Sequence, residues 1–306
     1  MNKIKNLLRN RNFILLLAAM FGLLLPQGSR WTEHLTLPAL AIVMSLSTMG
    51  VSGSVFRSPR SLILPGILGI LMSYVILTGF LLGISAIIIH DEDIWKGFII
   101  LAVVPPAVSI IPFTEYLNGN SRYSLIGTMA AYLGALIIMP VIVFEFLGSS
   151  SFDLNRVPMI IVLLIIVPLV ISRILLWKGM AEQLEPIKGT IINWSFFVVF
   201  YTIVGLNQDI LVGQPLRLVP VAAIAIASTF FLGLIIDSVG LFFRIDPRIT
   251  TSLVLLGTIK NYGLAGGLAL ALFGKQTALP ATVSAIFMFI YIIWLRFKVR
   301  GLPGRP

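Results

Sequence analysis

The sequence contains no cysteine and only two histidines, His34 and His90. Without cysteine it can form no disulfide framework, no thiolate nucleophile and no haem-attachment motif. Both histidines fall near predicted loops, so we expect no buried transition-metal centre. The other polar residues form no nucleophile–histidine pair, no pair of catalytic carboxylates and no phosphate-binding loop. The sequence therefore predicts neither an enzyme nor a resident cofactor.

Charged residues are also scarce. They make up 11% of the chain, against 58% hydrophobic residues, and the mean hydropathy is +1.02. Soluble domains carry about 25% charged residues, so this composition excludes a soluble protein. Apolar runs of roughly 18 residues or more recur along the whole sequence, each long enough to span a bilayer as a helix. The composition predicts an all-α polytopic membrane protein.

The apolar runs between polar interruptions predict ten transmembrane helices. Their ranges are 8–26, 35–52, 62–89, 97–117, 123–147, 157–177, 190–208, 217–243, 249–273 and 278–296. Basic residues precede the first run, but no small-residue cleavage pattern follows Leu25-Pro26-Gln27, so we interpret this run as a span and not as a signal peptide. We predict an interfacial connector at 178–189, between 1–177 and 190–306.

The formal charge of +10 lies mostly on one side of the predicted membrane. With the N-terminus inside, 16 of the 22 basic residues are cytoplasmic: Lys3, Lys5, Arg9, Arg11, Arg57, Arg60, Arg122, Arg173, Lys178, Lys188, Arg244, Arg248, Arg296, Lys298, Arg300 and Arg305. The positive-inside rule then predicts cytoplasmic N- and C-termini in a plasma or inner membrane. Charges distributed in this way indicate no nucleic-acid partner.

The ten predicted spans form two halves of five, spans 1–5 and spans 6–10; the segment 1–177 contains the first half plus span 6, and the connector precedes span 7. Because five is odd, the halves must lie in opposite orientations, which is the arrangement of an inverted repeat. The fourth span of each half contains residues that an ordinary membrane helix avoids, within 103–112 and 256–263. Disrupted helices at corresponding positions indicate a substrate site at the repeat interface.

Three prolines, Pro105, Pro106 and Pro112, predict that the fourth span unwinds. Each removes a backbone donor and disturbs the helix about one turn earlier. Non-helical backbone in a membrane persists only where it faces protein, water or ligand. A simple proline kink is the alternative interpretation.

Lys260 lies near the middle of the ninth span, with about eleven residues or more on either side. A charged lysine at this depth costs about 3 kcal/mol on insertion scales. We therefore expect it to face the bundle interior with a partner, or to release its proton. Its candidate partners are Glu115, Asp237, the broken helix ends and a bound substrate.

Other polar side chains surround the two disrupted segments in the sequence. Thr258, Asn261 and Tyr262 adjoin Lys260, and hydroxyls come from spans four and five at Ser109, Thr114, Ser124 and Thr128. Single serines and threonines in membrane helices often bond to their own helix instead. Two glycine pairs, Gly79 with Gly83 and Gly263 with Gly267, are spaced for close helix packing.

Two stretches of the sequence resemble the bile acid:sodium symporter family. One runs from Gly97-Phe-Ile-Ile-Leu-Ala-Val-Val-Pro105 through Thr114 to Asn118-Gly-Asn-Ser121. The other, Gly257-Thr-Ile-Lys-Asn-Tyr-Gly-Leu-Ala265, is similar to the family's Gly-Met-Gln-Asn-Ser-Gly-Leu-Ala signature. The resemblance implies ten helices in two inverted repeats whose fourth and ninth helices cross, a core of spans 3–5 and 8–10, and a panel of spans 1, 2, 6 and 7.

The sequence departs from the family at the positions that the resemblance assigns to sodium. Ser124 and Thr128 match hydroxyl ligands of one sodium ion, but Ile110-Ile111 replaces a Ser-Asn pair, Leu256 replaces the shared glutamate, and Lys260 replaces a glutamine. A buried sodium ion needs several oxygens and usually a carboxylate. The departures argue against two sodium ions and suggest that Lys260 takes the place of a bound cation.

We predict a secondary active transporter that moves a small organic anion, expected to be a carboxylate, by alternating access. Helix N-termini and a protonated Lys260 would attract the anion. Na⁺ and H⁺ are the candidate coupling ions: a proton through Lys260, or one residual sodium site at Ser124 and Thr128. A cation/proton antiporter of the same fold ranks second because Leu256 and Ile111 offer no carboxylate. An enzyme or a purely structural membrane protein ranks third.

Overall fold

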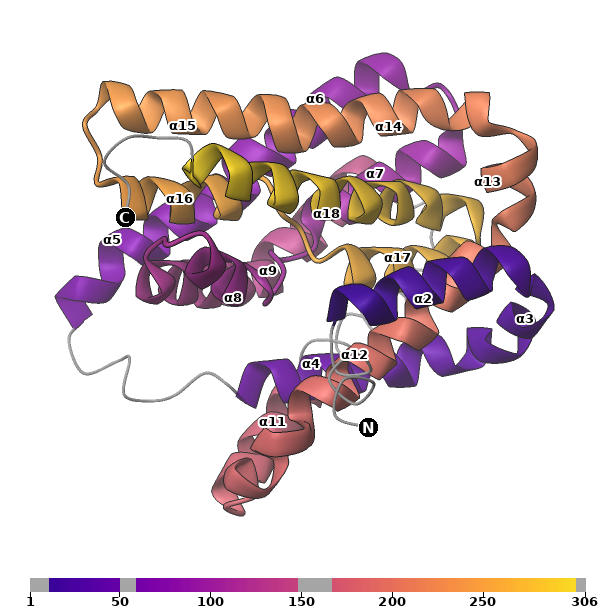
Figure 1. Ribbon diagram of the computed structural model, residues 1–306, viewed down its shortest axis with the longest axis horizontal. Coiled ribbons are helices and arrows are strands. Elements are labelled where there is room, and N and C mark those ends of the chain that lie inside the picture. The colour runs from indigo at the N-terminus through magenta and orange to yellow at the C-terminus, as the bar shows by residue number, and fades with distance from the viewer. Residues whose placement is uncertain (1–10, 50–58, 148–166, 301–306) are drawn as a thin grey trace.

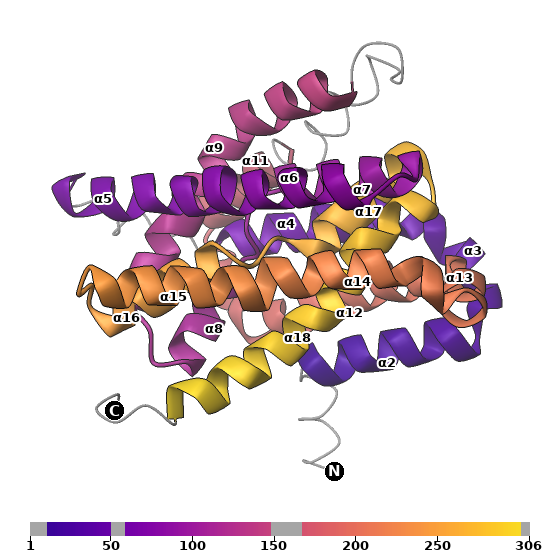
Figure 2. The ribbon, with the colours of Figure 1, turned by 90° about the horizontal axis from the view of Figure 1, so that it is seen from above.

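All regular structure in the described part of the chain is helical. The computed structural model describes residues 11–49, 59–147 and 167–300; within these ranges it contains helices and one isolated pair of bridged residues, but no strand. Helices α14 (Val219–Ile226), α15 (Leu232–Phe242) and α18 (Leu279–Arg300) run roughly along the long axis of the molecule (Figure 1). A view at right angles shows α9 (Ser121–Leu147) rising obliquely from the other helices (Figure 2). The all-α prediction is confirmed for these residues.

Sixteen α-helices form the described structure. They are α2 (Arg11–Leu24), α3 (Ser29–Thr32), α4 (Thr36–Met49), α5 (Pro59–Ile70), α6 (Thr78–Ile88), α7 (Glu92–Val103), α8 (Ile110–Tyr116), α9 (Ser121–Leu147), α11 (Val167–Trp177), α12 (Ala181–Leu206), α13 (Gln208–Gly213), α14 (Val219–Ile226), α15 (Leu232–Phe242), α16 (Pro247–Leu256), α17 (Tyr262–Phe273) and α18 (Leu279–Arg300). Two π-helical segments join neighbours into long rods: η4 (Leu71–Leu77) between α5 and α6, and η7 (Ala227–Phe231) between α14 and α15.

Several helices are long and apolar enough to cross a bilayer. In the described ranges there are five: Leu62–Ile88, Ser121–Leu147, Ala181–Leu206, Pro215–Phe242 and Gln276–Lys298. A sixth candidate is the pair Phe13–Leu24 and Pro26–Leu46, whose two parts are bent by 98° relative to each other. The chain is therefore a multi-pass membrane protein.

Fewer crossing helices are identified than the ten predicted spans, for physical reasons. Spans 97–117 and 249–273 are each divided into two helices, and each piece is shorter than the roughly 20 residues that a bilayer crossing needs. Residues 157–166 of the sixth span lie outside the described residues. Ten helices and an inverted repeat therefore remain proposals.

The predicted connector 178–189 is not a separate helix. Residues 178–180 form a turn after α11, with Gly179 at φ +70°, and the rest belongs to α12, which runs without interruption into the seventh predicted span. Pro186 is tolerated inside this helix near its start. The segment between the sixth and seventh predicted spans is thus a tight turn followed by the start of α12.

Helices α2, α4, α11 and α12 form one packed group, and this group contacts α17. Helix α12 packs on α2 and α4, and α4 also contacts α11; α17 touches α12 and α4. A Cβ on Gly263 would overlap the ring of Phe196, and one on Gly267 would overlap Leu40, so the predicted close packing at these two glycines is confirmed. The same prediction for Gly79 and Gly83 is wrong: both are exposed, with no atom within 4 Å of an added Cβ.

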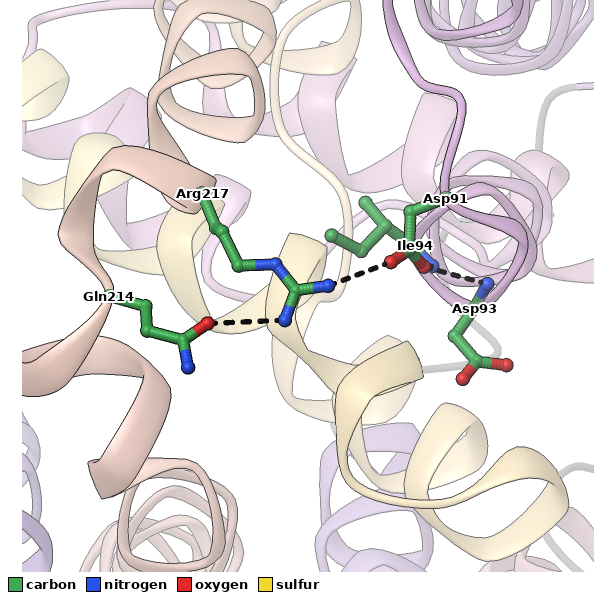
Figure 3. A network of polar contacts seen from close by, with 5 residues as sticks. All are labelled: Asp91, Asp93, Ile94, Gln214 and Arg217. Atoms are coloured by element: carbon green, nitrogen blue, oxygen red, sulfur yellow. Dashed lines mark hydrogen bonds and ion pairs between the residues drawn. The ribbon is translucent and has the colours of Figure 1, made fainter.

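The first turn of α7 is held by a capping carboxylate (Figure 3). Asp91 accepts hydrogen bonds from the backbone N–H groups of Asp93 and Ile94, at 3.0 and 3.1 Å. Its second oxygen lies 3.3 Å from Nη2 of Arg217, whose Nη1 donates to Gln214. Aspartate is among the preferred N-cap residues because it satisfies otherwise unpaired helix donors.

Replacing Asp91 with alanine is expected to destabilise the protein more than replacing Arg217 with glutamine. The alanine removes a cap worth about 1 kcal/mol, whereas a partly exposed ion pair contributes about 0 to 1 kcal/mol. Asp91→Asn is the matched control, because it keeps the cap and loses only the charge. In thermal unfolding of the purified chain, Asp91→Asn and Arg217→Gln should lose similar amounts of stability, and Asp91→Ala should lose more. Equal losses for Asp91→Asn and Asp91→Ala would contradict the capping role.

Candidate functional site

The two disrupted segments meet at one point. Helix α7 ends at Val103 and α8 begins at Ile110, while α16 ends at Leu256 and α17 begins at Tyr262. Between these ends, Pro106 and Lys260 form an isolated antiparallel bridge, and the N–H of Asn261 donates to the carbonyl of Pro105 at 3.0 Å. Backbone groups left without a helical partner at the two breaks thus hydrogen-bond to each other. Buried backbone groups in apolar surroundings need such partners.

Two of the three prolines account for the end of α7. Pro105 and Pro106 have no N–H to continue the helix, and Val104, which precedes them, is extended at φ −62° and ψ 150°. Pro112 lies elsewhere, in the first turn of α8, where a missing N–H needs no helical partner. The structure therefore corrects its predicted place in the break.

Asn261 fixes the beginning of α17. It is the N-cap residue: its side-chain oxygen accepts from the N–H of Leu264 at 3.2 Å, and its own carbonyl accepts from Ala265. The side-chain amide donates to the hydroxyl of Tyr132 in α9 at 3.4 Å. One side chain therefore both caps the broken helix and ties it to a neighbouring helix.

The amine of Lys260 is enclosed by one turn of the rod that contains α5, η4 and α6. Its side chain is 0% exposed, and Nζ donates to Oγ of Ser73 and Oγ1 of Thr78, each at 3.1 Å. Nζ also lies 4.4 Å from the ring centroid of Tyr74, within the range of a cation–π contact. Thr78 in turn donates to the carbonyl of Ala102 at 2.6 Å.

Neither predicted acidic partner reaches Lys260. Glu115 is exposed near the end of α8, and Asp237 pairs with Lys298 at 2.8 Å. Within the described ranges, the amine's hydrogen-bond acceptors are two uncharged hydroxyls. The structure thus corrects the expected carboxylate partner: Lys260 is held by dipoles and an aromatic face.

The π-helical geometry of η4 positions these groups. Ser73 and Tyr74 lie inside η4, and Thr78 opens α6, with its hydroxyl oxygen also 3.0 Å from the carbonyl oxygen of Ser73. Widened π turns in α-helices are rare and often coincide with functional sites. Sequence reasoning missed Ser73, Tyr74 and Thr78; the available signal was a pair of hydroxyl residues inside an apolar run.

Three other predicted site residues differ in whether their hydroxyl groups are already hydrogen-bonded. The hydroxyl of Thr258 donates to the carbonyl of Val254 at 2.6 Å, and that of Tyr262 to the carbonyl of Thr258 at 3.3 Å. Ser109 is buried, and its hydroxyl has no partner among the described residues. Of these three, only Ser109 keeps its hydroxyl hydrogen free to donate to a ligand.

The two residues of the suggested sodium site, Ser124 and Thr128, are both buried. The hydroxyl oxygen of Ser124 lies 2.7 Å from that of Thr114, while the hydroxyl of Thr128 has no partner in the described structure. Leu256 fills the neighbouring space against Gly127, at the position the resemblance gives to a glutamate. A buried hard cation needs several oxygen ligands, so this set fits a sodium ion poorly.

An apolar cavity of about 590 Å³ lies beside the crossing, enclosed by four helices. It is lined by side chains of α2 and α12 on one side and of α8 and α18 on the other: Leu15, Leu16, Ala19, Phe200, Val204, Phe113, Tyr116, Thr282, Ile286, Phe289, Ile290, Ile292 and Ile293. Leu15, Phe200 and Phe289 also line a gap of about 20 Å³ whose other lining residues include Lys260, Asn261 and Tyr262. These three side chains therefore separate the cavity from the crossing.

The comparison with protein families agrees with these features. A sequence model of the SBF-like CPA transporter family, of the bile acid:sodium symporter type, matches residues 14–294. No curated protein matches the chain. The match covers both disrupted segments, the enclosed lysine and the cavity, so the resemblance noted in the sequence is confirmed. The chain belongs to the SBF-like CPA transporter family, a family of membrane transporters.

Proposed function

We propose that this protein is a secondary active transporter that moves a small organic anion by alternating access, with Lys260 as a built-in cation. The observation that carries the proposal is the enclosed amine at the crossing of two broken helices. A charge in this position is costly, and intramembrane ionisable groups that face a bundle interior typically mark transport pathways.

An inverted repeat of ten spans accounts for irregularities that occur in pairs. Each proposed half contains one broken helix, and each contains one π-helical segment in its third span, at η4 and η7. The proposed core contains both pairs, and the proposed panel corresponds to α2, α4, α11 and α12. Rocking or sliding of the panel against the core would open the site to each side in turn.

The cavity indicates the kind of anion. Most of its lining is aliphatic or aromatic, and none of the lining side chains is charged. Such a surface binds an apolar body, while the few polar groups at its edges determine orientation. We infer that the anion is a carboxylate with an apolar body.

Lys260 would act as a coupling group and not as a direct ligand of the anion. Its amine points toward Ser73, Tyr74 and Thr78, none of which lines the cavity. A lysine in a dehydrated site favours its neutral form and regains a proton when water enters. Alternation between these forms would move a proton in place of a sodium ion.

Two alternatives are less well supported. A cation/proton antiporter needs a carboxylate at the crossing, and Leu256 occupies that position with 0% exposure. A sodium symporter with one residual site would depend on Ser124 and Thr128, and the hydroxyl of Ser124 is already paired with that of Thr114 at 2.7 Å.

Uptake into proteoliposomes under separately imposed proton and sodium gradients tests the proposal. The probes are radiolabelled phenylbutyrate, octanoate and decanoate, with entry into protein-free vesicles subtracted. We expect an inward proton gradient to drive accumulation in sodium-free buffer. Accumulation driven by sodium alone would contradict proton coupling, and cation exchange without any carboxylate would support the antiporter.

A further inference from the structure

A cationic side chain lies at the end of the apolar cavity. On α18, Ile292 and Ile293 line the cavity, and Arg296 follows one helical turn later. The guanidinium of Arg296 lies 4.6 Å from the ring centroid of Tyr116, which also lines the cavity. Nη1 of Arg296 donates to the backbone carbonyl of Tyr116. The guanidinium is therefore fixed where the cavity ends.

Arg296 retains unused binding capacity. Arginine has five N–H donors in a planar fork, and here its buried Nε–H has no partner among the described residues. It forms no ion pair with a carboxylate in the described ranges, whereas Lys298, two residues later on α18, pairs with Asp237 at 2.8 Å. A positive charge with free donors beside an apolar wall is suited to a carboxylate that carries an apolar body.

We propose that Arg296, supported by Tyr116, recognises the carboxylate of the transported anion at the mouth of the apolar cavity. The proposal rests on the proposed function and assigns its anion selectivity to a residue outside the crossing. Lys260 cannot make this contact in the observed conformation because its amine is turned toward Ser73 and Thr78. The two cations thus have separate tasks: Arg296 selects the anion, and Lys260 couples its movement.

Ligand-dependent thermal unfolding of the full chain in detergent tests the assignment. The probes are phenylbutyrate, octanoate and decanoate, each compared with its primary amide. In the wild type, we expect each carboxylate that binds to do so about 10-fold more tightly than its amide, since an ionised acceptor strengthens the hydrogen bonds. In Arg296→Gln, we expect equal affinity for acid and amide, with the affinity for the amide unchanged.

Two further variants keep the result interpretable. Arg217→Gln removes an arginine from the opposite end of the molecule and should leave the preference for the acid unchanged. If Arg296→Gln does not fold, Arg296→Lys carries the test: it keeps the charge without the fork, and the preference should fall about threefold.

The outcomes separate this proposal from the proposed function. A preference for carboxylates that survives unchanged in Arg296→Gln and Arg296→Lys would overturn the role of Arg296 and leave organic-anion transport intact. A wild-type protein that binds acids and amides equally would contradict organic-anion transport itself, and the role of Arg296 with it.

Discussion

Replacing Lys260 with methionine is expected to reduce gradient-driven anion accumulation about 100-fold or more, the equivalent of roughly 3 kcal/mol. Methionine has a similar length and no charge, so it fills the space between Ser73, Thr78 and Tyr74 without a proton to exchange. The protein should nevertheless fold. Replacing buried charges with apolar residues of similar volume is often neutral or stabilising, by about 1 to 4 kcal/mol.

Two measurements on the same preparations distinguish coupling from packing. Thermal unfolding should show that Lys260→Met is at least as stable as the wild type, while uptake is lost. Lys275→Met is the matched control: Lys275 is an exposed lysine that pairs with Asp209 at 3.3 Å, and its loss should leave uptake within about twofold, as is usual for surface ion pairs. Normal accumulation by Lys260→Met would show that the lysine is not part of the coupling mechanism.

The crossing could be predicted from the sequence because backbone chemistry is local. Pro105 and Pro106 interrupt a helix wherever they occur, and a lysine in the middle of an apolar run must find an interior environment. Pro112 shows the limit of the same reasoning. Whether a proline breaks a helix depends on how far it lies from the first residue of that helix. The sequence does not locate that first residue to within one helical turn.

The partners of Lys260 could not be predicted because they come from a distant helix. Ser73 and Thr78 are separated from it by 187 and 182 residues. Their orientation depends on the π-helical turn η4, which rotates the following side chains relative to an ordinary α-helix. Charge attraction suggested Glu115 and Asp237 as partners instead. Asp237, on α15, forms its ion pair with Lys298 on α18.

Glycine spacing gave a similarly mixed result. Gly79 and Gly83 have the spacing of a packing motif but are exposed, whereas Gly69 meets Gly127 of α9 backbone to backbone. Spacing shows that two small residues share a helix face; it does not show which face meets another helix. The contact between Gly69 and Gly127 lies one turn before Ser73, so the packing of α5 on α9 fixes the position of the groups that enclose Lys260.

Replacing Gly69 with alanine is therefore expected to destabilise the protein by about 1 to 3 kcal/mol, the usual cost of overpacking. The added Cβ would overlap the Cα, carbonyl carbon and oxygen of Gly127. Because these are backbone atoms, no side chain can rotate away, and α5 must separate from α9. We expect Ser73 to shift with α5 and the acceptors of Lys260 to be lost, so uptake should fall together with stability.

Gly79→Ala is the matched control for this prediction, because it makes the same chemical change ten residues later in the same helical rod. An added Cβ there meets no atom within 4 Å. Alanine also favours a helix over glycine by about 1 kcal/mol, so this variant should be neutral or slightly more stable. Thermal unfolding and uptake of the two variants can be compared directly. If Gly69→Ala behaves like Gly79→Ala, the contact between α5 and α9 does not position the groups around Lys260. Opposite effects of one methyl group at the two glycines would show that this helix contact holds the lysine site in place.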